Sequence, residues 1–486
     1  MTRHGCVSLL LVAMLCLVVG CKEKASTEQA KTNDTPAAGS PAGDTETGAV
    51  GQGSAPAEEP AQPVIAPEDL PTPVELTEDD WPWFRGQQND AKVHSQVKLA
   101  RSWPAEGPPV LWETTVGEGY SSPSVVGDRV YLNDYNEETK EWMVRCLSFD
   151  DGEEQWTYKV KKEIRPNHGI TRSAPATDGG FVFAIDPKCE LHCLDARNGN
   201  LIWKKFLPKL YDSMIPAWYN GQCPLIEGDR VIIAAGGKAL LVAFDKATGE
   251  PVWETPNPDQ QLITHSSVMP VELDGVRQYA YYTMQGLVGI DAETGAMLWQ
   301  FPWKFSTAVP TTPLALGDGK FLVTSSYGAR TAVCQVTHDG DTWKAEELLS
   351  LAPPTDGWNS EVHTPIVHNG KIYGVGKKSR GLWTCLDMEC NEVWNSRRKS
   401  FDLGGYVLAD GMFFALDGRS GALRLIDAEA DEYQQLAEAK ILSGPDVWAP
   451  PVIVRGKLLV RDLGKMLCLD VREQTLAADT SDSKLQ

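Results

Sequence analysis

A short segment that ends in tryptophan recurs along most of this chain of 486 residues. Its clearest copy runs from Leu191 to Trp203, where apolar and polar residues alternate up to Asp195 and the pair Asn198-Gly199 follows. Alternation with a period of two predicts a strand, and Asn-Gly tolerates the positive φ angles of a tight turn. The segment therefore predicts two antiparallel strands joined by a turn, with the tryptophan on the second strand.

Five further copies of the hairpin keep the same order of strand, turn and tryptophan. They end at Trp156, Trp253, Trp299, Trp343 and Trp394. Successive copies lie roughly 43 to 52 residues apart, which is the spacing of propeller blades. The repeat therefore predicts that each copy forms part of one blade.

A second hairpin precedes each copy and is marked by a tight turn and, in all but one case, by a proline near its first strand. Its turns are Gly127-Asp128, Asp178-Gly179, Gly228-Asp229, Asp274-Gly275, Gly317-Asp318, Asn369-Gly370, Asp410-Gly411 and Arg455-Gly456. Proline suits the start of a strand because no ladder donor is lost there. Two hairpins make a four-stranded antiparallel sheet, and eight such sheets predict an all-β fold, an eight-bladed β-propeller.

The two ends of the repeat region predict how the ring closes. The eighth unit stops at Asp470, and no tryptophan strand follows it. The segment from Val110 to Glu113, which includes Trp112, precedes the first hairpin and has no partner of its own. We expect this N-terminal strand to complete the last blade, because closure removes an open sheet edge.

The N-terminus has the features of an export signal. Residues 1–20 combine a basic start with an apolar run that is too short to span a bilayer, which predicts a signal peptide. Cys21 directly follows Leu17-Val18-Val19-Gly20 and resembles the cysteine of a bacterial lipobox, which is lipidated after cleavage. By the same resemblance, Lys22 rather than an aspartate after the cysteine favours the outer membrane.

Composition divides the rest of the chain. Residues 21–80 are rich in Ala, Pro, Gly, Thr and Glu, which predicts a disordered acidic tether. The cluster Trp81-Pro82-Trp83-Phe84-Arg85-Gly86 opens an ordered lead-in over residues 81–109. The propeller is expected over residues 110–472 and a flexible tail over residues 473–486. The formal charge of -21 argues against nucleic acid as a partner.

The repeat resembles that of a known superfamily. The segment from Ile290 to Trp299 is similar to the repeat of pyrroloquinoline quinone (PQQ)-type propellers, and Trp81 to Gly86 is similar to their lead-in. The resemblance implies that each tryptophan docks between neighbouring blades. It does not decide the function, because the superfamily contains quinone-dependent alcohol and sugar dehydrogenases as well as non-catalytic scaffolds. One such scaffold is the BamB-type lipoprotein of the outer-membrane β-barrel assembly machinery.

Residues just before the innermost strands are expected to gather at one mouth of the channel. They form a mixed aromatic, cationic and imidazole rim: Tyr120, Arg172, Trp218, Tyr219, Asn220, His265, Trp358, Glu361, His363 and Trp448. Such a rim suits a polar ring-shaped ligand, a peptide or a protein partner. The same residues would also serve to plug the channel, and the sequence does not separate these roles.

Metal binding would require residues from different repeats to converge. His265, Glu361 and His363 are the candidates, with His168 as a fourth ligand. No short ligand motif supports them. We therefore expect hydrogen-bonded rim histidines and no metal.

Eight of the eleven cysteines follow the predicted export signal and its lipidation site, Cys21. Five occupy one repeat position and are expected to be small buried apolar side chains: Cys146, Cys193, Cys334, Cys385 and Cys468. The other three are Cys189, Cys223 and Cys390. An oxidising periplasm permits Cys189 to pair with Cys193, or Cys385 with Cys390, although spacing alone does not establish the geometry.

The resemblance to quinoprotein dehydrogenases can be compared with the sequence. Such enzymes carry two adjacent cysteines over the quinone, ligands for Ca²⁺ and a catalytic aspartate. No two cysteines are adjacent in this sequence, and no catalytic aspartate is matched by motif. The repeated aspartates lie at hairpin turns, where we expect them to cap backbone N–H groups: Asp150, Asp195, Asp245, Asp291 and Asp387.

We expect a non-catalytic, monomeric propeller that binds other envelope proteins. Its link to the membrane is expected to be the lipid at Cys21 alone, on the periplasmic face of the outer membrane, and partner strands would add to blade edges. No cofactor is expected. Two alternatives stay open: a quinoprotein that binds PQQ with Ca²⁺ at the rim and oxidises an alcohol or sugar, and a sensor that binds a small carbohydrate or peptide there.

Overall fold

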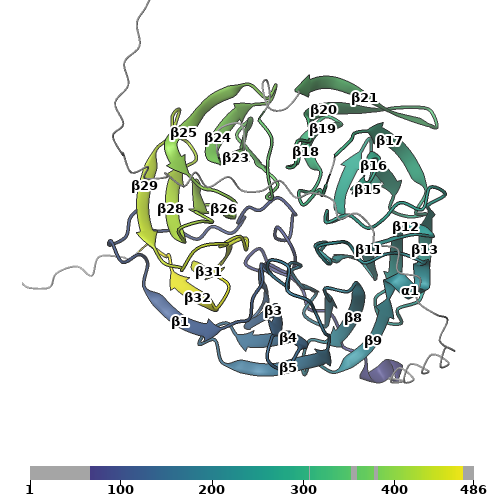
Figure 1. Ribbon diagram of the computed structural model, residues 1–486, viewed down its shortest axis with the longest axis horizontal. Coiled ribbons are helices and arrows are strands. Elements are labelled where there is room, and N and C mark those ends of the chain that lie inside the picture. The colour runs from purple at the N-terminus through teal and green to yellow at the C-terminus, as the bar shows by residue number, and fades with distance from the viewer. Residues whose placement is uncertain (1–65, 306, 352–357, 377–380, 474–486) are drawn as a thin grey trace, which may run out of the picture. The chain divides into compact units, whose positions relative to one another are not determined.

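The eight predicted sheets stand side by side in a ring (Figure 1). The computed structural model describes residues 66–305, 307–351, 358–376 and 381–473, and within them 32 strands form eight four-stranded antiparallel sheets. This is the eight-bladed β-propeller that the repeats predict. The predicted signal peptide (1–20), the lipidation site Cys21 and the greater part of the predicted tether and tail lie outside the described residues.

Strands of one blade follow one another along the chain. Blade 1 contains β2 (Ser124–Val126), β3 (Arg129–Asn136), β4 (Glu141–Ser148) and β5 (Glu154–Lys161). Blade 2 contains β6 (Ala176–Thr177), β7 (Phe181–Ile185), β8 (Glu190–Asp195) and β9 (Leu201–Phe206). Blade 3 contains β10 (Leu225–Glu227), β11 (Arg230–Gly236), β12 (Ala239–Asp245) and β13 (Pro251–Pro256). Blade 4 contains β14 (Met269–Leu273), β15 (Val276–Thr283), β16 (Gly286–Asp291) and β17 (Met297–Pro302).

The second half of the ring repeats this order. Blade 5 contains β18 (Leu314–Gly317), β19 (Lys320–Val323), β20 (Thr331–Asp339) and β21 (Thr342–Leu351). Blade 6 contains β22 (Ile366–His368), β23 (Lys371–Gly376), β24 (Leu382–Asp387) and β25 (Glu392–Ser400). Blade 7 contains β26 (Tyr406–Ala409), β27 (Met412–Leu416), β28 (Ala422–Asp427) and β29 (Gln435–Lys440). Blade 8 contains β30 (Val452–Val454), β31 (Lys457–Arg461), β32 (Lys465–Asp470) and, from the N-terminal side, β1 (Val110–Thr115).

In the described part of the chain, helical structure is limited to two short elements. These are the 3-10 helix η1 (Pro67–Asp69) and the helix α1 (Leu207–Tyr211), which follows β9. Among the described residues, no helix has the length and apolar character needed to cross a membrane.

The ring closes through the N-terminal strand. β1 pairs antiparallel with β32, and Trp112 lies opposite Cys468 in this register. β32 continues to β31 and β30, so the last sheet has four strands like the others. The predicted closure is therefore confirmed, and it removes the exposed edge that a three-stranded blade would leave.

Tryptophans on outermost strands hold neighbouring blades together. Four donate the indole N–H to a backbone oxygen of the next blade: Trp112 to Phe149 at 3.1 Å, Trp156 to Ala196 at 3.1 Å, Trp203 to Lys246 at 3.0 Å and Trp253 to Ala292 at 3.2 Å. Each indole also covers the turn glycine of that blade, so a Cβ atom built on Gly152, Gly199, Gly249 or Gly295 would lie within 2.7 Å of it. The inter-blade docking that the resemblance implies is present at these four boundaries.

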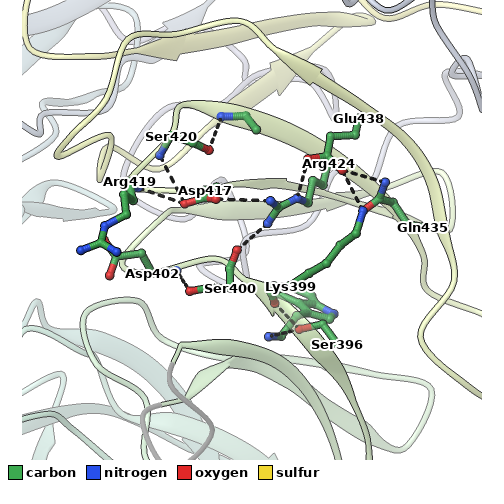
Figure 2. A network of polar contacts seen from close by, with 12 residues as sticks. Ser396, Lys399, Ser400, Asp402, Asp417, Arg419, Ser420, Arg424, Gln435 and Glu438 are labelled. Carbon is green, nitrogen blue, oxygen red and sulfur yellow. Dashed lines mark hydrogen bonds and ion pairs between the residues drawn. The ribbon is translucent and has the colours of Figure 1, made fainter.

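Other boundaries use different contacts. Trp299 donates its indole N–H to Gln278 Oε1 of its own blade at 2.7 Å. Between blades 6 and 7, Figure 2 shows a polar network centred on Arg424 of β28. Its guanidinium donates to the backbone oxygen of Ser400 at 2.5 Å and pairs with Asp417 and Glu438, each at 3.3 Å. The Arg424–Ser400 hydrogen bond, together with an ion pair of 2.8 Å between Lys399 of β25 and Glu438, thus joins these two blades, where the indole hydrogen bond is not repeated.

The channel is filled by the chain itself. Residues 81–93, which we call the plug segment, bind to the innermost strands or their leading residues in four blades (Figure 1). Trp81 exchanges two backbone hydrogen bonds of 2.8 Å with Val125, and Leu408 N donates to Ala91 O at 3.0 Å. Arg85 reaches across the channel and donates to the backbone oxygen of Thr364 at 2.9 Å. The predicted lead-in is therefore an internal part of the ring.

Residues 66–80 differ from the predicted disordered tether. Val74 N donates to Asp178 O at 3.0 Å, and the Asp80 carboxylate accepts from Gly127 N at 2.9 Å. Backbone hydrogen bonds to blade turns fix this segment, although its composition lacks the aromatic residues that usually signal order. Order in the chain therefore begins before the tryptophan cluster at residue 81.

Aspartates at the hairpin turns accept backbone hydrogen bonds, as predicted, with one exception. Asp245 Oδ1 accepts from Thr248 N at 2.8 Å, and Asp291 Oδ1 accepts from Thr294 N at the same distance. Asp150 does not act in this way and instead pairs with Lys457 Nζ at 3.0 Å. Ser148 takes the capping place in that turn, because blade 1 has serine where the other copies have aspartate.

We expect Gly295→Ala to destabilise the protein more than Gly275→Ala. Both glycines belong to turns of blade 4 and have nearly equal positive φ angles, +73° and +76°, so the backbone strain of an alanine is matched. A Cβ on Gly295 would lie 2.5 Å from Trp253, whereas a Cβ on Gly275 meets nothing within 4 Å. The difference in unfolding free energy, measured in urea, should be about 1–3 kcal/mol. Equal destabilisation would contradict the indole docking.

Candidate functional site

The mouth of the channel is the end at which the chain enters each innermost strand. Buried hydroxyl and thiol groups connect neighbouring blades there. Ser121 Oγ donates to Ser173 O at 2.9 Å, Ser267 Oγ accepts from Cys223 N at 2.9 Å, and Thr364 Oγ1 accepts from Thr312 N at 2.7 Å. These hydrogen bonds explain why polar residues recur before the proline positions. They also fix the connections between blades that contain the predicted rim residues.

Tyr120 and Trp448 form one side of the mouth. Their rings stack with centroids 4.7 Å apart, and the His168 ring lies 6.4 Å from Trp448. The Tyr120 hydroxyl accepts from Gly169 N at 3.0 Å. Burial raises the pKa of Tyr120 to about 12, so its hydroxyl stays protonated at neutral pH. The structure therefore brings these predicted residues together across the boundaries of blades 7, 8, 1 and 2.

Arg172 joins this group to the other side of the mouth. Its guanidinium donates to three backbone oxygens, those of Gly169 at 3.0 Å, Asn167 at 2.7 Å and Trp218. Burial lowers the pKa of Arg172 from its usual high value, yet the side chain stays a cation at neutral pH because no arginine loses its proton there. Arg172 thus fixes the connection that precedes blade 3.

Trp218 lies on the second side of the mouth. Its ring stacks on Tyr327 with centroids 6.0 Å apart and an interplanar angle of 11°, and the His265 ring lies 6.2 Å away. Burial lowers the pKa of His265 to about 4, with a further contribution from the Arg172 cation. His265 is therefore neutral at neutral pH. Tyr327 was missed by sequence reasoning, because it lies in the turn between β19 and β20 rather than before an innermost strand.

The remaining predicted rim residues mainly pack against, or form hydrogen bonds with, other parts of the propeller. Asn220 is buried and donates to Ser173 Oγ at 3.0 Å. Trp358 is buried against β23, where a Cβ on Gly376 would overlap its indole. His363 is hydrogen-bonded to the backbone oxygen of Leu403 at 3.0 Å, and Tyr219, at the edge of the mouth, donates its hydroxyl to Arg165 O at 3.0 Å. Glu361 is partly exposed.

The predicted metal candidates do not form a cluster. His265, Glu361, His363 and His168 are not among the carboxylate, imidazole and thiol groups whose ligand atoms converge in the described part of the chain. Burial lowers the pKa of His363 to about 4, and its hydrogen bond to a carbonyl oxygen matches the predicted role of a rim histidine. Among the residues that the structure describes, these four candidates therefore bring no converging set of ligand atoms to the mouth.

A converging group does occur in blade 2. Asp186, Glu190 and His192 are all buried, and their ligand atoms lie within 4.8 Å of one another. Lys162 Nζ lies 2.7 Å from Asp186 Oδ2 and 2.5 Å from Glu190 Oε2, and Lys204 Nζ lies 2.9 Å from Glu190 Oε1. Two ammonium groups therefore balance two carboxylates, and Lys162 fills the position between the oxygens. Sequence reasoning missed this group, although polar Glu190 and His192 on one face of β8 signalled it.

The pKa values of both carboxyl groups reflect this pairing. Burial alone would raise the pKa of Asp186 and of Glu190. The imidazole of His192 and the Lys162 ammonium, joined by Lys204 at Glu190, outweigh burial and hold both pKa values below their usual range. The group therefore forms a charge-balanced structural network.

All eight cysteines of the described residues are buried free thiols, so neither disulfide that the periplasm would permit is present. The five cysteines at the common repeat position are buried, as predicted: Cys146, Cys193, Cys334, Cys385 and Cys468. Cys223 has a separate role, because its sulfur accepts from Ala174 N at 3.2 Å. Burial raises the pKa of Cys223 to about 11, which keeps the thiol protonated at neutral pH.

We expect Lys162→Met to lower the free energy of unfolding at pH 7 by about 3–5 kcal/mol, because it leaves buried carboxylates without their shared cation. Urea denaturation measures the loss. Lys161→Met is the matched control, since the neighbouring Lys161 only donates to the backbone oxygen of Thr139 at 3.0 Å. A similar loss in both variants would contradict the assigned role of Lys162.

The same network predicts acid sensitivity. The folded pKa values of Asp186 and Glu190 are depressed, so their contribution to stability is present above the unfolded pKa of about 4 and is lost as the pH falls through the lower folded values. Unfolding free energy should therefore fall between about pH 4.5 and pH 3. The fall should be smaller in Lys162→Met, where the carboxylates have lost their partner, and an unchanged pH profile would contradict this assignment.

Solved structures with the same fold include both scaffolds and enzymes. BamB from Moraxella catarrhalis superposes with a TM-score of 0.51 and 15% identity, covering 75% of this chain and 99% of that one. Quinohemoprotein alcohol dehydrogenase from Comamonas testosteroni gives a TM-score of 0.56 and 13% identity, covering 82% of this chain and 81% of that one. At such identities the likeness shows the fold alone.

Sequence comparison adds a family to this fold. A protein of Yersinia pestis called outer membrane protein assembly factor BamB is 23% identical over 324 residues, covering 63% of this chain and 75% of the relative. The protein of the same name from Burkholderia pseudomallei is 26% identical over 230 residues, covering 44% of this chain and 53% of the relative, so the chain spans about half the length of that relative. The model of the family described as outer membrane protein assembly factor BamB matches residues 93–210 and 140–400, more than half of the sequence, and the chain therefore belongs to this family.

Proposed function

We propose that this chain is a non-catalytic scaffold of the cell envelope, which binds other envelope proteins. The observation that carries this proposal is its membership of the BamB family together with a channel filled by its own plug segment. Trp81 and Arg85 occupy the centre of the ring and are 5% and 7% exposed. The mouth and the outer blade edges are then the surfaces that remain for partners.

The outermost strands suit protein partners. Each has one side without a strand neighbour inside its sheet, and exposed apolar side chains project from several of them. Leu348 on β21 is 56% exposed and Val393 on β25 is 48% exposed. An extended segment of a partner gains backbone hydrogen bonds at such an edge, and apolar side chains add contact area. Blades 5 and 6 are therefore candidates for strand addition.

The proposed location follows from the N-terminal sequence and the family. The lipobox-like cysteine, Cys21, would anchor the chain to the outer membrane, and the following segment would let the propeller act on the periplasmic side. The matched relatives are named outer membrane protein assembly factors, and this name agrees with a location at the outer membrane. We further propose that the propeller acts as a monomer.

The second candidate function is a PQQ-dependent dehydrogenase. The aromatic rings and Arg172 at the mouth favour it, because a planar anionic quinone could stack and pair there. The donor set does not fit the Ca²⁺ that accompanies this quinone: of the predicted rim residues Glu361 alone carries a carboxylate, and it does not converge with the rim histidines. We therefore favour the scaffold function over the dehydrogenase function.

Photo-crosslinking tests the scaffold proposal. A benzophenone amino acid at Leu348 or Val393 should crosslink to envelope proteins when the chain is expressed in its native membrane, because these positions lie on open blade edges. Asp229 is the control position, since its side chain is 93% exposed in a turn between β10 and β11. Crosslinks should be identified by mass spectrometry. Recovery of no envelope protein from either edge position would contradict strand-edge binding.

A cofactor-binding test distinguishes the dehydrogenase from the scaffold. Purified protein incubated with PQQ and Ca²⁺ should show no dye reduction with a panel of alcohols and sugars, because the mouth lacks a set of carboxylate ligands. Equilibrium dialysis against PQQ provides a readout that does not depend on activity. Stoichiometric binding of PQQ with substrate-dependent dye reduction would favour the dehydrogenase over the scaffold.

A further inference from the structure

The connection between blades 2 and 3 exposes apolar side chains on the mouth side of the ring. It begins with α1, at the end of β9, and runs to β10 (Figure 1). Leu210 is 48% exposed, Met214 is 59% exposed and Ile215 is 36% exposed. No other six consecutive residues of the described chain contain three large apolar side chains that are exposed. We call residues 210–218 the apolar loop.

The second half of the apolar loop has no charged, amide or hydroxyl side chain. It consists of Met214, Ile215, Pro216, Ala217 and Trp218. Met214, Ile215 and Ala217 are exposed, and the other two are partly buried. Covering such a surface is favourable, because the free energy gained grows with the apolar area removed from water. Single exposed apolar residues are common, whereas a continuous group of them marks an interaction site.

Backbone hydrogen bonds hold the apolar loop in this conformation. Ser213 N donates to Pro208 O at 3.1 Å, and Tyr219 N donates to Pro216 O at 2.8 Å. The exposed side chains are therefore already in place for contact with a partner surface, and no change in the fold is needed.

Cations lie around the apolar loop, although the whole chain has a formal charge of -21. Lys238 N donates to Tyr211 O at 2.7 Å, and Arg165 N donates to the Tyr219 hydroxyl at 3.2 Å. Among the described residues, those with a charge that lie in residues 207–219, or form hydrogen bonds or ion pairs with them, are the cations Arg165, Arg172, Lys209 and Lys238 and the acids Asp212 and Glu254. Cations outnumber acids here, which favours an anionic surface as the partner.

Aromatic rings lie where the apolar loop returns to the ring of blades. Trp218 stacks on Tyr327, which is 47% exposed, with centroids 6.0 Å apart. Apolar side chains, then aromatic rings with polar edges and cations, are the groups that proteins place from the acyl chains of a bilayer outward to its headgroups. An apolar pocket in a partner protein would require the apolar side chains alone. The combination therefore favours a membrane surface.

The described chain begins in the same part of the ring. The backbone oxygen of Asp69 accepts from Arg197 Nη2 at 3.1 Å, in the turn before β9, and β9 leads directly to α1. Residues 22–65 separate Cys21 from the described chain, and a segment of this length spans at most about 150 Å. The lipid at Cys21, which rests on the proposed function, and the apolar loop can therefore reach one bilayer.

We propose that the apolar loop inserts Leu210, Met214 and Ile215 into the surface of an anionic phospholipid bilayer. Interfacial segments insert by about 5–10 Å, to the boundary between headgroups and acyl chains. The loop is then a second membrane contact, in addition to the lipid that the sequence predicts as the sole link. This contact turns the connection between blades 2 and 3 toward the bilayer and leaves the outer edges of blades 5 and 6 to protein partners.

Vesicle flotation tests the proposal. The full mature chain with Cys21→Ser is used, because it lacks the proposed lipid and its binding reports on the protein surface alone. Vesicles of phosphatidylcholine with phosphatidylglycerol should bind the protein with half-saturation at an accessible lipid concentration on the order of 1 mM. Binding to vesicles of phosphatidylcholine alone should be at least about threefold weaker, because the cations around the loop then lack anionic headgroups.

A fluorescent probe on the apolar loop locates the contact. Met214→Cys provides an exposed thiol, and a nitrobenzoxadiazole reagent labels it selectively because all eight cysteines of the described residues are buried. Its emission should rise and shift to shorter wavelength on addition of the anionic vesicles, because the probe leaves water. Met297→Cys is the matched control, since Met297 is 39% exposed on β17 of blade 4, and its probe should not respond.

Serine variants measure the contribution of the apolar side chains. Met214→Ser combined with Ile215→Ser should weaken vesicle binding at least about fivefold, whereas Met297→Ser should leave it unchanged. Circular dichroism checks that each variant is folded.

Three results would overturn the proposal. They are no flotation with the anionic vesicles up to about 5 mM lipid, equal binding of the double variant and the parent chain, or a benzophenone amino acid at Met214 that crosslinks in membranes to an envelope protein instead of lipid. The last result would make the apolar loop a protein-docking surface. Crosslinking at Leu348 and Val393 is independent of vesicle binding, so failure here leaves the proposed scaffold function untouched.

Discussion

The ring depends on an indole that reaches from one blade to the next. At four boundaries a buried or partly buried tryptophan combines a hydrogen bond to a backbone oxygen with close contact to a turn glycine, for example Trp203 with Lys246 and Gly249. The apolar ring provides burial, and the N–H donates to a backbone carbonyl of the next sheet. Glycine is required there because any Cβ would enter the indole. Strand pairing forms each blade, and at these four boundaries the indole contact joins one blade to the next.

Charged groups form a second kind of joint between blades. Arg424 of blade 7 donates to the backbone oxygen of Ser400 in blade 6 and is held by Asp417 and Glu438 of its own blade. At the boundary of blades 1 and 2, Lys162 joins the segment after blade 1 to two acids in blade 2. Paired charges of this kind are tolerated in partly buried joints because each ion has several partners. The molecule thus uses two chemically different joints, and the boundary of blades 1 and 2 contains both.

Repetition explains which features the sequence predicted. Blades, turns and closure through Trp112 rest on local patterns that occur many times, so one irregular copy such as Asp150 did not obscure them. The plug segment could not be predicted, because its fold depends on contacts such as that of Arg85 with Thr364, 279 residues away, and on left-handed φ angles at Arg85, Asn89 and Ala91. Tyr327 was missed for a similar reason. The turn between β19 and β20 brings it to the mouth, and the spacing of the repeats does not predict the path of that turn.

The plug segment also determines how mechanical load enters the propeller. A force that pulls on the chain before residue 66 meets the Arg197–Asp69 and Val74–Asp178 hydrogen bonds before it reaches the paired bonds between Trp81 and Val125. Because the segment from Trp81 to Val93 holds blades on opposite sides of the axis, tension is shared among several innermost strands. A propeller built in this way resists being peeled open from one blade edge, since β1, the strand that closes the ring, follows the plug segment along the chain.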